Sequence, residues 1–231
     1  MAGSTEHTTS RDESGHRERL RKEFLKNGFA GLADYKAVEL LLTFFVHRRD
    51  VKGSAKSAIK RFGTFRGVLD ATPQELTTID GIGPVAAENL KLLRLAAEHY
   101  LRQKAEQANS FADPDDLYGY CRMAMGALAV EQFRVFYVDG AGRTTKESIS
   151  EGTVDRANVF PREVMHGALS ENAVGVIVAH NHPTGDSTPS EHDKLLTRAL
   201  ALAAETLGVR FHDHLVIGKD EVFSFRAEGL L

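Results

Sequence analysis

The stretch "AVGVIVAHNHPTGDSTPSEHDKLL", residues 173–196, changes from apolar to polar and then to a helical pattern. Its first part is a short, valine-rich run, which predicts a buried β-strand. Pro183 cannot donate to a sheet ladder and ends that strand, while Gly185 lets the chain turn. A helix then begins at Pro189 and Ser190. The stretch therefore predicts a strand, a polar loop and a helix in direct succession.

Three potential metal ligands lie within this unit. Side chains two apart on a strand leave from the same face, so the imidazoles of His180 and His182 can converge on one cation. Asp193, in the first turn of the helix, can turn its carboxylate back towards the strand end. Two imidazoles and one carboxylate suit zinc and leave a fourth position for water, whose pKa zinc lowers to about 7. The spacing therefore predicts a catalytic zinc site.

Hydrolysis at such a site also needs a general base and support for the oxyanion. Glu147 and Glu151 lie four apart on a predicted upstream strand, so they face the same way, and either could be the base. Ser190 could donate to the oxyanion. Simpler roles compete with these: Ser190 is also a good helix N-cap, and Asp193 suits the positive end of a helix dipole.

The rest of the second half predicts an α+β sheet domain over residues 108–231. Residues 132–152 alternate in polarity around a Gly-containing turn, which predicts a β-hairpin. A helix over residues 161–172 and strands over residues 209–218 and 221–229 complete it, with a right-handed crossover between strands that flank a helix. The "HDH" at 212–214 is a second His-x-His; we expect core packing, or a side chain there that orients a zinc ligand.

The first half of the chain predicts a small all-helical domain over residues 16–107, preceded by a disordered tail over residues 1–15. Helices are expected over residues 34–46, with Asp34 as N-cap, and over 51–63, ending at Gly63. Thr72, Pro73 and Glu75 have the spacing of a capping box. A glycine-rich turn then opens a long amphipathic helix.

That turn, Gly81-Ile82-Gly83, resembles a helix-hairpin-helix motif, which binds the DNA backbone without reading its sequence. The glycines accept backbone angles that other residues avoid, and the isoleucine packs into the domain core. The free N–H groups at the start of the next helix can bind a phosphate. Pro84 removes one of these donors. The hairpin therefore predicts either a non-specific DNA contact or a plain corner between two helices.

Composition limits the classes of protein that fit. The chain has 231 residues, a net charge of −3 and one cysteine, so it forms no internal disulfide. Residues 1–110 hold 18 Lys and Arg against 14 Asp and Glu, so only the first half is positively charged. No apolar run approaches the roughly 20 residues that span a bilayer, and the polar N-terminus lacks the apolar core of a signal peptide. We expect a cytoplasmic protein without a membrane partner; no feature indicates its oligomeric state.

The spacing of His180, His182, Ser190 and Asp193 matches the JAMM signature of the JAB/MPN fold at every defining position. Over about residues 20–231 the chain resembles the RadC family within that fold, through "PREV", "HNHP" and "DHLVIG". The resemblance implies an α/β/α, cytidine-deaminase-like sheet domain and one zinc ion per chain. It implies that Ser190 supports the tetrahedral intermediate, and alignment on Gly152 favours Glu147 over Glu151 as the acid/base.

Three functions are compatible with these residues. The resemblance favours a zinc metallopeptidase that cleaves peptide or isopeptide bonds in a protein or peptide substrate, with a helical domain that could bind DNA. A non-enzymatic DNA-binding protein associated with repair is an alternative. A metal-dependent nuclease could use the same ligands, but no second carboxylate cluster points to two-metal chemistry.

Overall fold

The computed structural model describes residues 6–47, 49–110, 112–151 and 160–231, with side chains from residue 15 onwards. The chain divides into two compact units, Met1–Ala97 and Glu98–Leu231. We expected the boundary after residue 107. The difference arises because one long helix, α6 (Pro84–Gln107), runs through the division. Its last turns, including Leu101 and Ala105, belong to the core of the second unit.

The first unit is all-helical, as expected. Its elements before α6 are α1 (Glu6–Asn27), η1 (Phe29–Gly31), α2 (Asp34–Phe45), α3 (Lys52–Phe62), α4 (Phe65–Asp70) and α5 (Pro73–Leu76). Helix α1 corrects the prediction of a disordered tail over residues 1–15, since residues 6–15 are helical and 1–5 lie outside the described residues. That segment contains no proline, so nothing in it blocks the extension of the helix towards the N-terminus.

Local sequence features mark where several of these helices begin and end. Thr72 and Glu75 form the predicted capping box at the start of α5. Gly63, with φ of 83°, follows α3 in the left-handed region that glycine tolerates. Asp34 is not the N-cap of α2, a position that Ala33 takes. Its carboxylate instead accepts the N–H of Phe65 at 2.7 Å, which satisfies the first turn of α4.

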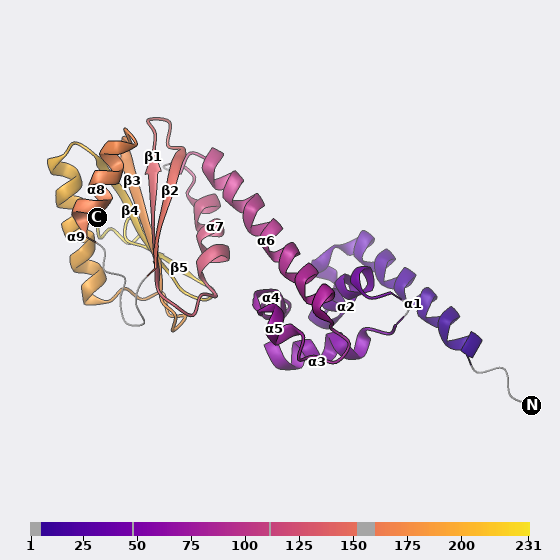
Figure 1. Cartoon of the computed structure of the whole chain (residues 1–231). Helices are drawn as coiled ribbons and strands as arrows, with labels where there is room; N and C mark the ends of the chain where they lie inside the picture. The colour runs from indigo at the N-terminus through magenta and orange to yellow at the C-terminus, as the bar shows by residue number, and fades with distance from the viewer. Residues whose placement is uncertain (1–5, 48, 111, 152–159) are drawn as a thin grey trace, which may run out of the picture. The chain divides into compact units, whose positions relative to one another are not determined.

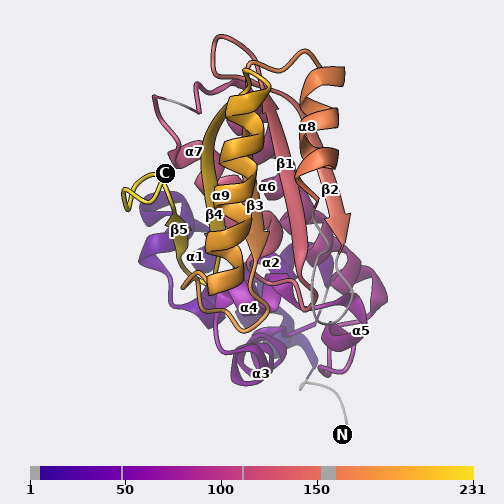
Figure 2. The same cartoon turned by 90° about the vertical axis from the view of Figure 1, so that its left-hand side faces the viewer.

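The second unit is built on one mixed five-stranded sheet (Figure 1). The strand order is β2-β1-β3-β4-β5, formed by β1 (Gln132–Val138), β2 (Thr144–Glu151), β3 (Gly175–Asn181), β4 (Arg210–Ile217) and β5 (Val222–Ser224). The predicted hairpin is the antiparallel pair β1 and β2. Strands β3 and β4 are parallel, and α9 (Glu191–Thr206) connects them. In Figure 2, α9 lies in front of these two strands.

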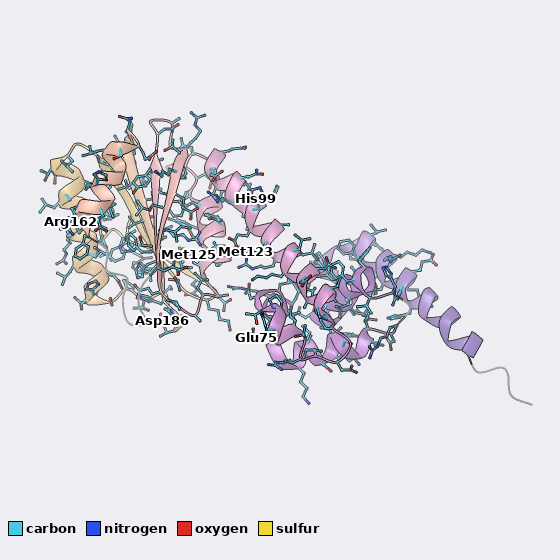
Figure 3. The ribbon with its side chains drawn as sticks, in the orientation of Figure 1. Glu75, His99, Met123, Met125, Arg162 and Asp186 are labelled. Atoms are coloured by element: carbon cyan, nitrogen blue, oxygen red, sulfur yellow. The ribbon has the colours of Figure 1, made fainter. Side chains whose placement is uncertain are left out.

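Helices cover both faces of this sheet, so the unit has the expected α/β/α layers. Helices α8 (Pro161–Ser170) and α9 cover one face, while α7 (Asp115–Met125) and the last turns of α6 cover the other (Figure 1). Phe133, Val135 and Tyr137 of β1 pack under α8 and α9. Phe136 and Val138 alternate to the α7 face, where they meet the buried Met125 that Figure 3 labels. We refer below to the α9 face and the α7 face.

One irregularity in β4 decides where three polar side chains point. Val176 pairs with Phe211 and Ile177 with Asp213, so His212 is an extra residue that forms a bulge. His212 and Asp213 therefore line the same cavity on the α7 face, while the next residue, His214, returns to the α9 face. Burial lowers the pKa of His212 to about 4, and Arg210 and Arg226 add to the effect. At neutral pH its ring is uncharged.

Among the described residues, no helix is long and apolar enough to cross a bilayer.

We predict that Gly175→Ala destabilises the second unit by about 1–3 kcal/mol, because the site is already full. A Cβ there would lie 2.9 Å from the carbonyl oxygen of Arg210 and 2.6 Å from Nε2 of the buried His212. Urea denaturation measures the change. Gly119→Ala is the control, since the same methyl group on helix α7 meets nothing within 4 Å. This control should hold or gain stability, and an equal loss in both variants would contradict the bulge packing.

Candidate metal centre

The end of β3 and the start of α9 bring the three predicted ligands together. His180 is the sixth residue of β3, His182 directly follows the strand, and Asp193 is in the first turn of α9. The two Nε2 atoms lie 3.1 Å apart. Oδ1 of Asp193 lies 3.2 Å from Nε2 of His180, and Oδ2 lies 3.4 Å from Nε2 of His182. The three side chains therefore form a candidate metal centre.

These separations fit a tetrahedral ion. Zinc binds imidazole nitrogen and carboxylate oxygen at about 2.0–2.1 Å, so two of its tetrahedral ligand atoms lie about 3.3–3.4 Å apart. The two Nε2 atoms are 3.1 Å apart, close to that value, and each lies 3.2–3.4 Å from a different oxygen of the Asp193 carboxylate. Two imidazoles and one carboxylate fill three corners of the tetrahedron. The donor set is therefore the right size and chemistry for one ion with an open fourth position.

The ligands lie at the border between the core and solvent. His180 and Asp193 are buried, whereas the side chain of His182 is 20% exposed. Burial by itself raises the pKa of Asp193, but hydrogen bonds from His180, His182 and Ser190 outweigh it and hold the pKa far below its usual range. The carboxylate is thus ionised at neutral pH. The candidate site is therefore accessible to solvent from the His182 side.

Hydrogen bonds behind the rings orient both histidines. Nδ1 of His182 lies 2.8 Å from the carbonyl oxygen of Asp186, which can only accept, so Nδ1 carries the proton. Asp186 lies on the loop after β3 and is labelled in Figure 3. When this imidazole is neutral, its Nε2 presents a lone pair to the site. Nδ1 of His180 lies 2.9 Å from Nε2 of His214, which confirms that the "HDH" motif supplies a residue beside a ligand.

Ser190 supports Asp193, and its geometry does not favour the predicted oxyanion role. Ser190 is the N-cap of α9, and its hydroxyl oxygen accepts the N–H of Asp193 at 3.2 Å. Its hydroxyl proton and its backbone N–H both go to Oδ2 of Asp193, at 2.7 and 2.6 Å. A hydroxyl has one proton to donate, so none remains for an oxyanion in this arrangement. The capping role that competed with the oxyanion role is the one observed.

Glu147 lies on the wrong face of the sheet to serve as the acid/base, which corrects that prediction. It pairs across the ladder with Phe136, whose side chain is on the α7 face, whereas His180 pairs with Phe133 on the α9 face. The carboxylate of Glu147 is 4% exposed. It accepts from Arg134 at 2.7 Å and from Tyr120 at 2.9 Å. Glu147 is therefore part of a buried ion pair.

Glu151 shares the face of Glu147, because residues four apart on a strand point the same way. It pairs with Gln132 at the end of the sheet near the metal centre. The alternation of β2 therefore directs both candidate glutamates to the α7 face. The face that this hairpin presents to the candidate metal centre depends on the register of β1 against β3, a strand distant in sequence, which a motif alignment does not contain.

A glutamate that sequence reasoning missed, Glu131, lies on the metal side. It precedes β1 by one residue, and Gln132 donates its N–H to the side chain of Asn181 at 2.8 Å. One further step along the register brings Glu131 opposite His182. The hydrogen bond to Asp193 chiefly raises the pKa of His182, and the charge of Glu131 contributes to that rise. The half-buried Glu131 is thus the better candidate for a base. Its position at the start of a predicted strand was the available signal.

The hairpin residues Gly81, Ile82 and Gly83 lie in the first unit. They directly precede α6, and Ile82 belongs to the hydrophobic core. Ile82 is 2% exposed, and Gly81 has φ of 87°. A Cβ on Gly81 would lie 2.2 Å from the hydroxyl oxygen of Ser54, which donates to the carbonyl of Asp80. Both packing and backbone conformation therefore require glycine at position 81, whereas a Cβ on Gly83 would meet nothing within 4 Å. The side chain of Asp80 is 98% exposed beside them and forms an ion pair with Arg49 at 3.4 Å.

Comparison with known proteins agrees with this architecture. A family model described as "RadC-like JAB domain" matches residues 111–230. A UPF0758 protein of Ruegeria pomeroyi is 42% identical over 217 residues, covering 94% of this chain and 97% of its own length. Relatives of the same name from Rhodobacter capsulatus and Fusobacterium nucleatum are 42% and 36% identical. They cover 92% and 96% of this chain and their own whole lengths. The chain belongs to the RadC-like JAB-domain family.

Proposed function

We propose that this protein is a zinc-dependent hydrolase of the JAMM type that cleaves peptide or isopeptide amide bonds. The observation that carries the proposal is the convergence of His180, His182 and Asp193, whose ligand atoms lie within 4.8 Å of one another, with one side open to solvent. When bound, zinc lowers the pKa of a coordinated water to about 7 and polarises a carbonyl group. The family and the donor set support zinc over harder ions, which prefer oxygen ligands.

Other groups around the centre position its ligands or transfer protons. Ser190 fixes the carboxylate of Asp193, and the carbonyl of Asp186 fixes the ring of His182. Glu131, beside the exposed ligand His182, is placed to take a proton from the attacking water and return it to the leaving amine. General acid–base transfer of this kind contributes about 10²–10⁴-fold to rates.

An amide substrate is favoured over a phosphodiester. Within the part of the chain that the structure describes, the triad is the single group of three or more His, Cys, Asp or Glu side chains that converge. Two-metal nucleases need a second set of ligands about 3.5–4 Å away. A protein or peptide chain therefore fits the site better as the substrate.

The first prediction concerns the metal. Purified protein dialysed against zinc should retain close to one ion per chain by elemental analysis, and His182→Ala should lose it because only two ligands remain. His192→Ala is the matched control: this exposed histidine next to Asp193 lies outside the triad and should keep the metal. Equal zinc in all three proteins would refute the metal centre.

The second prediction distinguishes the catalytic role proposed for Glu131 from the structural role of Glu147. Glu131→Gln should keep zinc but lower hydrolysis of a quenched fluorescent peptide library by about 10²-fold or more, because the proton carrier is gone. Glu147→Gln should keep zinc and activity while folded, yet lower the unfolding free energy by about 3 kcal/mol or more, since Arg134 loses its buried partner. The reverse pattern would show that Glu147, and not Glu131, is the base. Cleavage of plasmid DNA instead of peptides would establish the nuclease alternative.

Nucleic-acid binding by the first unit is a second candidate function, and helix α3 supplies the observation. Its sequence contains four basic residues and no acidic one. Lys52, Lys56 and Lys60 follow each other at four-residue spacing, so they line one face of the helix. None of the three forms an ion pair with a described residue. We infer that α3, rather than the hairpin glycines, would meet a phosphate backbone.

Charge reversal tests this surface in the full chain. Lys56→Glu with Lys60→Glu should weaken binding to a duplex oligonucleotide and lower the slope of log K against log salt by about 2, since each lost phosphate contact removes about 0.9. The control, Lys22→Glu with Lys26→Glu on α1, changes the net charge equally. If both pairs weaken binding alike, net charge rather than α3 is responsible. No binding by the unmodified chain at low salt would exclude the function.

A further inference from the structure

His180 and two buried side chains behind it, His214 and Thr197, form a continuous hydrogen-bonded chain. Nδ1 of His180 lies 2.9 Å from Nε2 of His214, whose Nδ1 lies 2.6 Å from the hydroxyl oxygen of Thr197. That hydroxyl lies 2.6 Å from the backbone carbonyl of Asp193. His180 and Thr197 are 1% exposed and His214 is 0% exposed. The hydrogen-bonded chain therefore begins at the side chain of one candidate ligand, His180, and ends on the backbone of another, Asp193.

The far end of this chain determines the position of every proton in it. A carbonyl oxygen can only accept, so the hydroxyl of Thr197 must give its single proton to Asp193. The same hydroxyl can then only accept from His214, which places the proton of that ring on Nδ1. A neutral His214 leaves Nε2 as an acceptor, and Nδ1 of His180 must donate to it.

The surroundings of His214 keep its ring neutral. It stacks on Phe225 with ring centroids 5.1 Å apart and meets Phe133 edge-on at 6.2 Å. Neither of its nitrogen atoms is hydrogen-bonded to a carboxylate. A second proton would bury a charge without a partner, which is costly in an apolar setting. The ring reaches this position because the bulge at His212 returns His214 to the α9 face.

We propose that His214 and Thr197 are positioning residues that fix the tautomer of His180, with Nδ1 protonated and Nε2 free to bind metal. Without this chain, the proton of His180 is no longer held on Nδ1. On Nε2 it would point at Oδ1 of Asp193, 3.2 Å away, and close the site with a hydrogen bond. The inference rests on the metal centre of the proposed function and is independent of which bond the protein cleaves.

The experiment compares matched variants of the full chain by titration of the metal-free protein with Co²⁺, followed by visible absorption. Thr197→Val keeps the shape but removes the hydroxyl, and Thr197→Ser keeps the hydroxyl. We expect Thr197→Val and His214→Leu to weaken cobalt binding about 10–100-fold, as loss of such outer partners does. Thr197→Ser and His214→Gln, which retain an acceptor for the chain, should stay within a few fold of the unmodified protein.

Long-range ¹⁵N NMR of the histidine rings reads the tautomer directly. Metal-free protein should show His180 protonated at Nδ1, and Thr197→Val should shift population towards Nε2. A loss of packing alone would lower thermal stability without this shift. If His214→Leu does not fold, the Thr197 pair decides the question.

Equal cobalt affinity in Thr197→Val and Thr197→Ser, or an Nε2 proton on His180 in the unmodified protein, would overturn the inference. These outcomes are distinct from failure of the proposed function. If the proposed function alone fails, the unmodified protein will bind cobalt with the predicted tautomer but cleave no amide bond.

Discussion

The carboxylate of Asp193 is held by the first turn of its own helix, and the metal centre depends on this arrangement. Ser190 gives both its hydroxyl proton and its N–H to Oδ2, which turns the carboxylate back towards the end of β3. A helix cap thus becomes the support of a metal ligand. Because the cap is local, it positions Asp193 as soon as α9 forms. Packing of α9 on the sheet then brings the carboxylate to His180 and His182.

The sheet separates the two kinds of polar cluster in the second unit. The α9 face carries the metal ligands, whereas the α7 face carries the buried pair of Glu147 and Arg134. Both clusters contain ionisable groups in an apolar setting, but their surroundings differ. Glu147 is enclosed by donors, while the side chain of His182 remains open to solvent. Access to solvent distinguishes the candidate metal centre from the buried ion pair.

The bulge in β4 connects the core to the metal centre. With regular alternation, Phe211 and His214 would point to opposite faces of the sheet. The extra residue, His212, allows both to face α9. Asp213 meanwhile accepts from Ser224 and Tyr118 on the α7 face. One inserted residue therefore provides both a buried anchor and the neutral imidazole behind His180.

The sequence by itself determined the features that depend on near neighbours. The alternation of a strand places His180 and His182 on one face, and the cap at Ser190 brings Asp193 back, so the triad could be predicted from its spacing. The layers of helix and strand follow from local polarity patterns in the same way. Only the tertiary structure decided which glutamate lies on the side of the candidate metal centre and which ring lies behind His180. Those choices depend on the register of β1 against β3 and on the bulge at His212 in the pairing of β4 with β3, which arise from contacts between segments distant in sequence. A one-residue change in register reverses the face of every side chain, so Glu131 and His214 could not be assigned by spacing alone.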